Sequence, residues 1–263
     1  MKKKNINISI LITAEQKENY ISKTINSCLE QSYKKIEIIV VYTSLKNEKF
    51  LKKKFRNKKI IFLKIEKRLR NKTQDQFYKI FEAFKISKGK IITLLDGDDL
   101  YTKDKILTLS KQKRIDNNFY LDNFIEVKNN KHKKIIEKKF KNSKLYQYIF
   151  NEWPKNIVTS AISGGRSVFN NFFNYVNFRD YKFLAIDALI ILYAYEKKKL
   201  IKLNKYLTFK VYTDNSVDLN FIGLLNKYFW QRRLEQHNYF KNISKKNYFS
   251  IDYIICKFLN TFL

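Results

Sequence analysis

The first hundred residues alternate short apolar runs with longer segments whose apolar positions recur every three or four residues. Short apolar runs are typical of buried strands, and the longer spacing is typical of helices that bury one face. The expected strands are 6–13, 36–42, 59–65 and 89–95, and the expected helices are 19–32 and 73–89. This alternation predicts βαβ units and an α/β fold with a mainly parallel central sheet flanked by helices.

The ends of the second helix have local signals of their own. Thr73 and Gln76 stand three residues apart, the spacing of a capping box, and Gly89 is expected to end the helix. The strand at 91–95 then runs directly into Asp96.

After residue 100 the pattern changes. A helix is expected at 103–115, followed by an antiparallel hairpin, 119–127 with 133–139, around an Asn129-Asn130 turn. Further helices are expected at 142–151, 166–175, 180–198, 219–240 and 246–262, with short strands at 160–163 and 206–212. The predicted organisation is one domain over 1–215 and a helical C-terminal extension over 216–263.

Charge is the main compositional signal. The 263 residues include 54 Lys and Arg against 24 Asp and Glu, a net charge of +30, and 44% of the residues are hydrophobic, enough for a substantial core. Such an excess favours anionic partners: nucleotide diphosphates, nucleic acid or acidic lipid head groups. Most of the lysines are nevertheless expected on solvated faces.

Several kinds of site and location are disfavoured. Cys28 and Cys256 lie far apart in apolar surroundings and are expected to be reduced core thiols. His132 and His237 have no partner at metal-ligand spacing, which disfavours a zinc site. The first apolar run stops at Ile12, and no apolar stretch reaches the roughly 18–20 residues of a membrane span. We therefore expect a cytoplasmic protein that does not cross a bilayer.

Three carboxylates follow the strand at 91–95. Asp96, Asp98 and Asp99 occur within four positions, and Gly97 allows a tight turn. Carboxylates this close repel one another, and a divalent cation would relieve that repulsion. An exposed acidic turn, or a helix cap at Asp99, explains the same residues. The triplet alone leaves both interpretations open.

Three segments in a fixed order narrow the choice: SCLEQSY at 27–33, EIIVV at 37–41 and GKIITLLDGDDLYTKDKI at 89–106. With them, residues 6–110 resemble the family 2 glycosyltransferases. The resemblance implies a GT-A fold and inverting transfer of a sugar from a nucleotide diphosphate sugar to a hydroxyl of a saccharide or lipid-linked acceptor. It also implies Mg or Mn as the cofactor.

The resemblance assigns roles by position. Asp98 is expected to bind the metal, and Asp187 is expected to be the catalytic base, with Asp180 as the alternative base. Asp187 could equally be a buried helix residue paired with a cation. The residues expected to contact the donor are Ala14, Glu15, Asp75 and Asp96, and those expected on the acceptor side are Trp153, Ser160 and Arg166.

Two departures from the family pattern keep alternatives open. Tyr42-Thr43-Ser44 stands where the family has two aspartates, one of which holds the nucleobase, and 209–212 lacks the family's metal-binding histidine. A degenerate, inactive member is therefore one alternative. A basic nucleic-acid-binding protein using the aromatic and arginine-rich helix at 228–240 is another, although nucleic acid is the less favoured partner. A nucleotidyltransferase is disfavoured because TAEQKEN, after the first strand, has no glycine.

The C-terminal helices are the remaining candidates for a partner surface. The aromatic face at 228–240 is expected to pack on the core. The segment 248–263 is expected either to dock on the domain or to lie on a membrane, which would place the protein peripherally at the inner face of the cell membrane.

Overall fold

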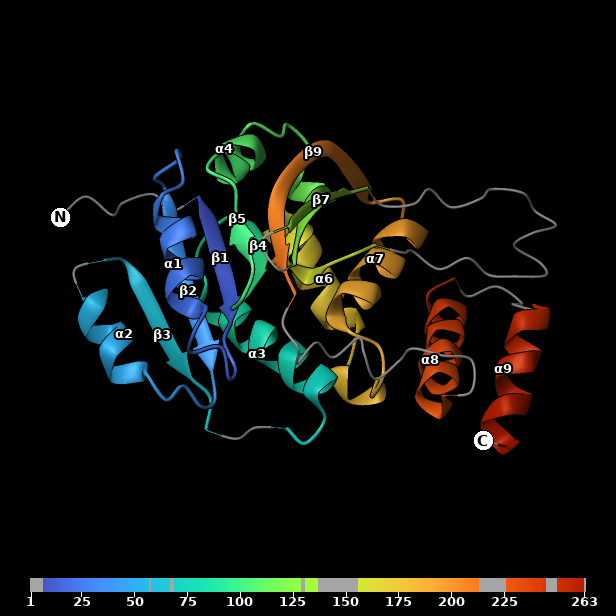
Figure 1. Ribbon diagram of the computed structural model, residues 1–263. Coiled ribbons are helices and arrows are strands. Elements are labelled where there is room, and N and C mark those ends of the chain that lie inside the picture. The colour runs from blue at the N-terminus through green and yellow to red at the C-terminus, as the bar shows by residue number, and fades with distance from the viewer. Residues whose placement is uncertain are drawn as a thin grey trace.

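A single mixed sheet runs through the molecule, with helices on both of its faces (Figure 1). The computed structural model describes residues 7–56, 58–66, 69–128, 131–136, 156–212, 226–244 and 250–262. Within these residues nine strands form the sheet, in the order β3-β2-β1-β4-β8-β6-β9-β5, and β7 pairs with β6. The predicted α/β class is confirmed.

The first half of the sheet is parallel. It consists of β1 (Ile8–Thr13), β2 (Ile36–Tyr42), β3 (Ile60–Lys64) and β4 (Ile91–Asp96). Thr13 pairs with Val41 on one side and with Asp96 on the other, so the carboxyl ends of three strands lie side by side. Polar groups that follow these strands therefore gather at one edge, where open α/β sheets bind their ligands.

The second half of the sheet is mixed. It contains β5 (Leu100–Tyr101), β6 (Phe119–Lys128), β7 (Lys131–Ile135), β8 (Ile162–Gly165) and β9 (Leu200–Val211). Strand β9 runs parallel to β6, with register shifts at 122–124, and its far end pairs with β5. Figure 1 shows β9 as a long curved strand that arches over the sheet. This curvature returns the end of β9 to the segment that follows β4.

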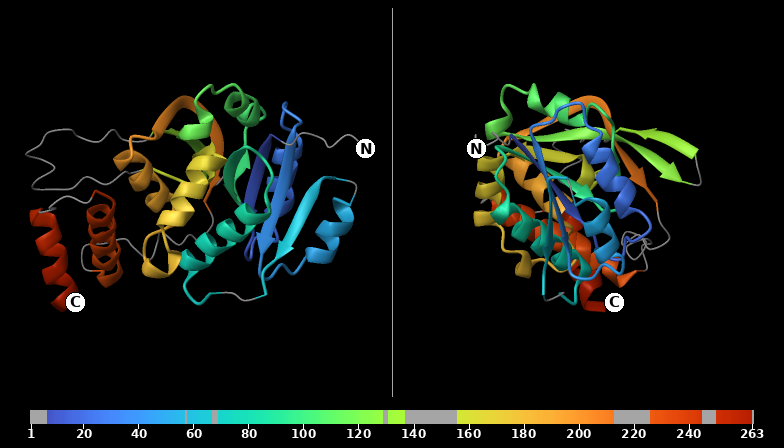
Figure 2. Two further views of the ribbon diagram at one scale, coloured as in Figure 1. Left: turned by 180° about the vertical axis from the view of Figure 1, so that it is seen from behind. Right: turned by 90° about the vertical axis from the view of Figure 1, so that its left-hand side faces the viewer.

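Helices cover both faces of the sheet (Figure 2). They are α1 (Ile21–Leu29), α2 (Glu48–Lys54), α3 (Lys72–Ile86), α4 (Lys105–Ser110), α6 (Arg166–Tyr175), α7 (Ile186–Glu196), α8 (Lys227–Ser244) and α9 (Ile251–Phe262). Short 3-10 turns at 115–117, 159–161 and 178–180 connect them. In the part of the chain described here, no helix combines the length and apolarity of a membrane span.

Two apolar cores explain why the strands are apolar almost throughout. Leu11 and Ile39 face a core with α3, α6 and α7, whereas the alternate residues Ile10 and Ile38 face a core with α1 and α2. Both faces of a parallel sheet are buried, so its strands read as continuous apolar runs. Several aromatic rings contact one another in the first core, for example Phe77 and Phe172, whose centroids lie 5.8 Å apart.

The structure corrects the predicted limits of α3. Its N-cap is Asn71, whose Oδ1 accepts hydrogen bonds from the backbone N–H groups of Thr73 and Gln74 (2.9 and 3.0 Å), so no capping box forms at Thr73. The helix ends at Ile86, before Gly89. Gly89 is needed instead for close packing, because a Cβ there would come within 2.5 Å of the backbone nitrogen of Ser9.

Other differences concern element length. The hairpin of β6 and β7 is confirmed, but β9 begins at Leu200 rather than 206, and α4 is shorter than predicted. Helix α2 and strand β5 were not predicted, because one is a seven-residue, lysine-rich turn and the other has two residues. The predicted helix at 142–151 lies outside the described residues.

The C-terminal helices pack against the main body. On α8, Tyr239 and Ile243 join the α3–α6–α7 core, and the Tyr239 hydroxyl donates to the Leu189 carbonyl (2.9 Å). The boundary expected at 215 falls outside the described residues, so the division into a domain and a helical C-terminal extension stays a prediction. The contact shows that α8 is part of the same folded unit as α7.

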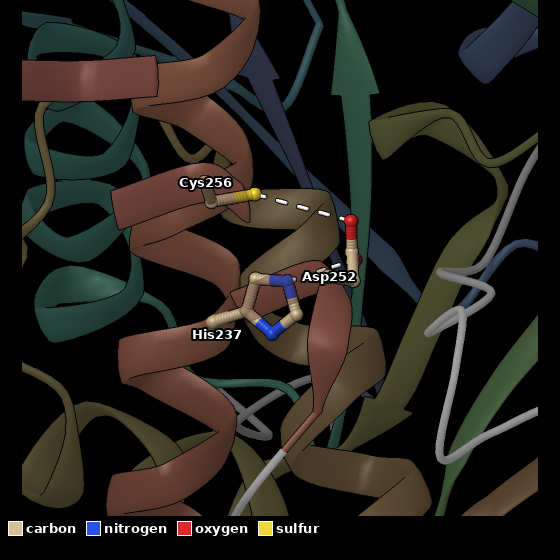
Figure 3. Close-up of side chains that lie close together, drawn as sticks. All are labelled: His237, Asp252 and Cys256. Carbon is tan, nitrogen blue, oxygen red and sulfur yellow. Dashed lines mark hydrogen bonds and ion pairs between the residues drawn. The ribbon is translucent and has the colours of Figure 1, made fainter. Parts of the chain in front are cut away.

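A buried polar cluster joins α9 to α8 (Figure 3). Candidate metal-binding atoms of His237, Asp252 and Cys256 lie within 4.8 Å of one another. The Asp252 carboxylate, however, accepts from Arg233 Nε and pairs with Arg233 Nη2 (2.8 and 2.7 Å), and His237 Nε2 lies 2.9 Å from it. Because the Arg233 guanidinium contacts both oxygens of the Asp252 carboxylate, binding of a metal cation to that carboxylate is disfavoured. The cluster is best described as an interhelical ion-pair network.

Candidate active site

The acidic turn after β4, residues 96–99, is held tightly against the end of β1. The Asp99 N–H donates to the Asp96 carbonyl (3.0 Å), and the Gly97 N–H donates to the Thr13 carbonyl (2.8 Å). A Cβ at Gly97 would lie 2.8 Å from that carbonyl oxygen, so only glycine lets the turn come this close. From α1, Thr24 Oγ1 donates to the Gly97 carbonyl (2.9 Å).

Asp96 is half-buried at the carboxyl end of β4. Its Oδ1 accepts hydrogen bonds from Gln76 Nε2 on α3 (2.7 Å) and from Thr13 Oγ1 (3.2 Å). Lys210 Nζ, on β9, lies 3.8 Å from Oδ2. Burial raises the pKa of Asp96 above its usual value. The carboxylate is thus oriented by three different elements.

Asp99 is fully buried behind the turn and has a supporting role. Oδ2 accepts from Ser160 Oγ (2.6 Å) and lies 3.5 Å from Lys210 Nζ, while Oδ1 accepts from the Val211 N–H (3.0 Å). Burial raises the pKa of Asp99 to about 7. Because both oxygens are engaged by the protein, Asp99 fixes the turn rather than offering a ligand.

Asp98 points to the loop after β1, where its carboxylate pairs with the Lys17 ammonium. The carboxylate is nearly buried, whereas a quarter of the Lys17 side chain is exposed. The preceding residue, Gln16, has a left-handed backbone (φ 53°). That conformation is costly for a residue other than glycine and is found where the chain must turn sharply, here immediately before Lys17.

Glu15 and Asp75 meet on one buried lysine. Lys79 Nζ lies 2.7 Å from Glu15 Oε2 and 2.6 Å from Asp75 Oδ2. The same Glu15 oxygen accepts from the backbone N–H groups of Thr43 and Ser44 (3.1 and 3.4 Å). The Ala14 N–H is taken up by the Val41 carbonyl (2.9 Å). Three of the predicted donor residues thus lie at the same sheet edge as Asp96.

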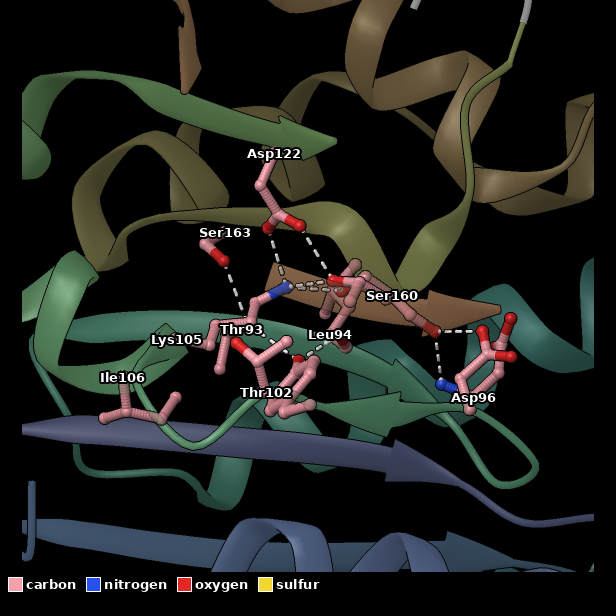
Figure 4. Close-up of polar contacts among 12 residues, drawn as sticks. Thr93, Leu94, Asp96, Thr102, Lys105, Ile106, Asp122, Ser160 and Ser163 are labelled. Carbon is pink, nitrogen blue, oxygen red and sulfur yellow. Dashed lines mark hydrogen bonds and ion pairs between the residues drawn. The ribbon is translucent and has the colours of Figure 1, made fainter. Parts of the chain in front are cut away.

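Ser160 links this edge to a second buried pair (Figure 4). Its Oγ accepts from the Asp96 N–H (3.0 Å), and its carbonyl accepts from Lys105 Nζ (2.6 Å). Lys105 Nζ lies 2.8 Å from Asp122 Oδ2 and donates to Thr208 Oγ1 (2.8 Å). Burial lowers the pKa of Lys105 and raises that of Asp122. This network joins β6, β9 and the acidic turn.

Asp187 is half-buried in the first turn of α7, where its Oδ1 accepts from the Ala188 N–H (2.7 Å). The chain just before α7 is tied to α3: Gln74 Nε2 donates to the Arg179 carbonyl (3.0 Å) and Asn71 Nδ2 to the Lys182 carbonyl (2.8 Å). Since α3 also provides Gln76 to Asp96, α7 begins beside the same region. Asp180, by contrast, is exposed on a 3-10 turn.

Arg166 is not brought to this region. It begins α6 at the opposite, amino end of β4, where its Nε donates to the Gly89 carbonyl and its Nη2 to Ser87 Oγ (both 2.8 Å). Strand β8 runs antiparallel to β4, so residues after it are carried away from Asp96. Arg166 therefore lies at the opposite end of β4 from Asp96, and its acceptor role stays a prediction. Trp153 lies outside the described residues.

Four lysines of the site were not singled out from the sequence: Lys17, Lys79, Lys105 and Lys210. The spacing of Asp75 and Lys79, four residues apart on a helix, is the usual signal of an ion pair and could have identified one of them. The others reach carboxylates distant in the sequence, for which no local pattern exists.

We expect Lys105→Met to lower the free energy of unfolding by about 3–5 kcal/mol, because it leaves the buried Asp122 carboxylate without its cation. Adding Asp122→Asn should recover part of this loss, so that the two changes together cost less than their sum. Urea-induced unfolding measures both effects. Lys103→Met, at an exposed position two residues away, is the control and should change stability little. Strictly additive losses would show that the pair is not coupled.

Comparisons with known proteins place the chain in a family. A family model described as glycosyl transferase family 2 matches residues 9–175. The chain is 28% identical, over 253 residues, to the uncharacterized glycosyltransferase MJ1057 of Methanocaldococcus jannaschii, and the match covers 84% of this chain and 83% of that protein.

Solved structures share the fold. S. aureus TarS 1-349 in complex with UDP-GlcNAc has a TM-score of 0.63 at 16% identity, covering 90% of this chain and 67% of that one. The mannosyltransferase PcManGT from Pyrobaculum calidifontis, in complex with GDP-Man and Mn2+, has a TM-score of 0.57 at 11% identity, covering 97% and 69%. At such identities the likeness concerns the fold alone.

Proposed function

The chain belongs to glycosyl transferase family 2 and has a GT-A-like fold, and from this premise we propose that it transfers a sugar with inversion. The donor is a nucleotide diphosphate sugar, and the acceptor is a hydroxyl of a saccharide or lipid-linked glycoconjugate. Family membership and neighbours solved with UDP-GlcNAc and GDP-Man support this donor class. We further propose that the protein acts in the cytoplasm, on polysaccharide biosynthesis.

The observation that carries the proposal is the acidic turn with its cations. Asp96 is the last residue of β4 and lies beside the end of β1, and Asp98 follows in the turn. Lys17 lies beside Asp98, and Lys210 lies beside Asp96. A leaving diphosphate needs positive charge where its own negative charge develops, and fixed groups supply this without reorganisation. Two ammonium groups beside two carboxylates suit an anionic ligand that arrives with a cation.

The residues fit a Mg or Mn ion. Carboxylate oxygens are the ligands that these ions prefer. Asp98 would hold the ion and Asp96 would lie beside the donor, whereas Asp99 has both oxygens engaged. When bound, the ion would neutralise the departing diphosphate. In this structure Lys17 pairs with the Asp98 carboxylate. The Lys17 ammonium would have to move away when the ion binds, and it could then contact the diphosphate.

Asp187 is the proposed base. The carboxylate takes the proton of the acceptor hydroxyl, whose oxygen forms a bond to the anomeric carbon. The bond from that carbon to the diphosphate oxygen breaks with its electron pair, and the nucleoside diphosphate leaves. Asp187 is half-buried at a helix start tied to α3, whereas Asp180 is exposed. A carboxylate sheltered from water and held beside the donor edge suits this role better.

Other predicted contacts take more limited roles in the proposal. Ser160 is fully buried and bonds to the acidic turn, so it positions Asp96 and Asp99 rather than touching the acceptor. Glu15 accepts hydrogen bonds from the backbone of Thr43 and Ser44, which follow β2 where the family has two aspartates, one of which holds the nucleobase. We propose that this loop, with Asp75 and Ala14 behind it, forms the wall of the donor site.

The decisive test is release of nucleoside diphosphate from a panel of nucleotide sugars, with Mn or Mg. We expect the native chain to act on one donor only when the metal is present, and Asp98→Asn to be slower by about 10²-fold or more. No release and no nucleotide binding across the panel would favour a degenerate member. Salt-sensitive binding to nucleic acid, unaffected by Asp98→Asn, would favour the nucleic-acid-binding alternative.

With that donor, Asp187→Asn should lower kcat by about 10²–10⁴-fold and leave donor affinity unchanged, because the amide cannot take a proton. Steady-state kinetics and donor titration separate the two quantities. Asp180→Asn is the matched control, and we expect it to keep native activity. The opposite ranking of the two variants would assign the base to Asp180.

A separate prediction concerns metal binding without turnover. Lys17→Met removes the ammonium that competes for Asp98, so the donor-free protein should bind Mn2+ about tenfold more tightly. Electron paramagnetic resonance of free Mn2+ measures this affinity directly. Lys59→Met removes the same charge at the amino end of β3, at the far edge of the sheet, and should have little effect. Equal or weaker Mn2+ binding by Lys17→Met would show that Asp98 is not a ligand of the metal.

A further inference from the structure

Helix α9 presents a continuous apolar stripe to solvent. Its members are Ile251, Ile254, Ile255, Phe258 and Phe262, which are 41%, 49%, 39%, 60% and 70% exposed. At about 100° of rotation per residue, these five side chains fall within an arc of about 100°. Isolated exposed apolar residues are common, but a contiguous stripe on one helix face marks an interaction surface.

The rotation of α9 is fixed by polar contacts rather than by this stripe. Asp252 and Cys256 are 5% and 0% exposed and face α8, where Asp252 contacts His237 (Figure 3). Arg233, also on α8, pairs with the same carboxylate. On the same side, the Tyr253 hydroxyl donates to Asn238 (3.1 Å). The stripe therefore faces away from α8. Figures 1 and 2 show α9 beyond α8, at the end of the molecule opposite to α2.

The C-terminal segment that carries the stripe is rich in basic residues. From residue 226 onward the chain has two acidic residues, Glu235 and Asp252, and seven basic ones: Lys227, Arg232, Arg233, Lys241, Lys245, Lys246 and Lys257. Both acids are engaged internally, Glu235 with the backbone N–H groups of 182–184 and Asp252 with Arg233. Lys257, on α9 itself, is exposed next to the stripe. In this segment the basic residues outnumber the acidic ones seven to two, and the whole chain has a net charge of +30.

We propose that α9 is a membrane-docking helix that lies flat on a bilayer containing anionic phospholipids. The apolar stripe inserts at the boundary between head groups and acyl chains, Lys257 beside it binds lipid phosphate, and the net positive charge of the chain attracts the anionic surface. A second copy of the chain is the poorer occupant, because pairing two such segments would bring their excess positive charges together. An anionic bilayer buries the apolar stripe and at the same time attracts the positive charge of the protein.

This inference goes beyond the proposed transfer reaction and does not depend on it, since docking needs neither donor nor metal. The full chain is mixed with sedimentable vesicles of phosphatidylcholine alone, or of phosphatidylcholine with about 30% phosphatidylglycerol. We expect binding to the anionic vesicles, little binding to the neutral ones, and release as salt is raised through physiological strength.

Variants test whether α9 is responsible. Ile254→Glu combined with Phe258→Glu should lower the partition coefficient by about tenfold or more, because two inserted side chains become charged. Phe262→Glu, at the most exposed position of the last turn, should weaken binding without endangering the fold. The matched control is Phe50→Glu on α2, which is 60% exposed like Phe258 but lies at the other end of the molecule, and it should bind normally.

Equal binding to neutral and anionic vesicles, or unchanged binding by both α9 variants, would overturn the proposal. Light scattering of the vesicle-free protein gives the remaining outcome. A dimer that the α9 variants abolish, together with an absence of vesicle binding, would assign the stripe to a second copy of the chain.

Discussion

The site depends on the contact between the end of β1 and the turn after β4. Thr13 pairs with Asp96 in the sheet, accepts from the Gly97 N–H, and donates its hydroxyl to the Asp96 carboxylate. Parallel strands fix this register along their whole length, because both faces of the sheet are packed in apolar cores and a slip of one residue would exchange the side chains between the two cores. The positions of the Asp96 and Asp98 carboxylates thus follow from the packing of the core beneath these strands.

Burial makes this arrangement expensive, and the lysines offset the cost. Asp75, Asp99 and Asp122 are almost inaccessible to water, and each has an ammonium group nearby: Lys79, Lys210 and Lys105. A buried ion pair of this kind adds little net stability but penalises any structure in which a partner is missing. We infer that the pairs specify the shape of the site. Three of the many lysines thus neutralise buried carboxylates of the site, although most of the lysines are on exposed faces.

Periodicity was sufficient to predict the parallel half of the fold, because each strand there is buried on both faces and each helix on one. It failed where a short or polar element is held by tertiary contacts, as with α2 and the two-residue β5. The same division applies to the site. Asp96 and Asp98 follow a strand, so their place could be anticipated. Arg166 was assigned to the acceptor side by resemblance, but the antiparallel direction of β8 carries it to the other edge. Only the topology reveals that direction.

The C-terminal helices are connected to the candidate base. Glu235 on α8 accepts hydrogen bonds from the backbone N–H groups of Lys182, Phe183 and Leu184, just before α7 begins. That segment is also bonded to the first turn of α3, whose Gln76 contacts Asp96. The segment that precedes α7, the helix with Asp187 in its first turn, is therefore held by hydrogen bonds from both α3 and α8. Since α9 is joined to α8 through Arg233 and Asp252, both C-terminal helices are connected to the start of the helix that carries Asp187.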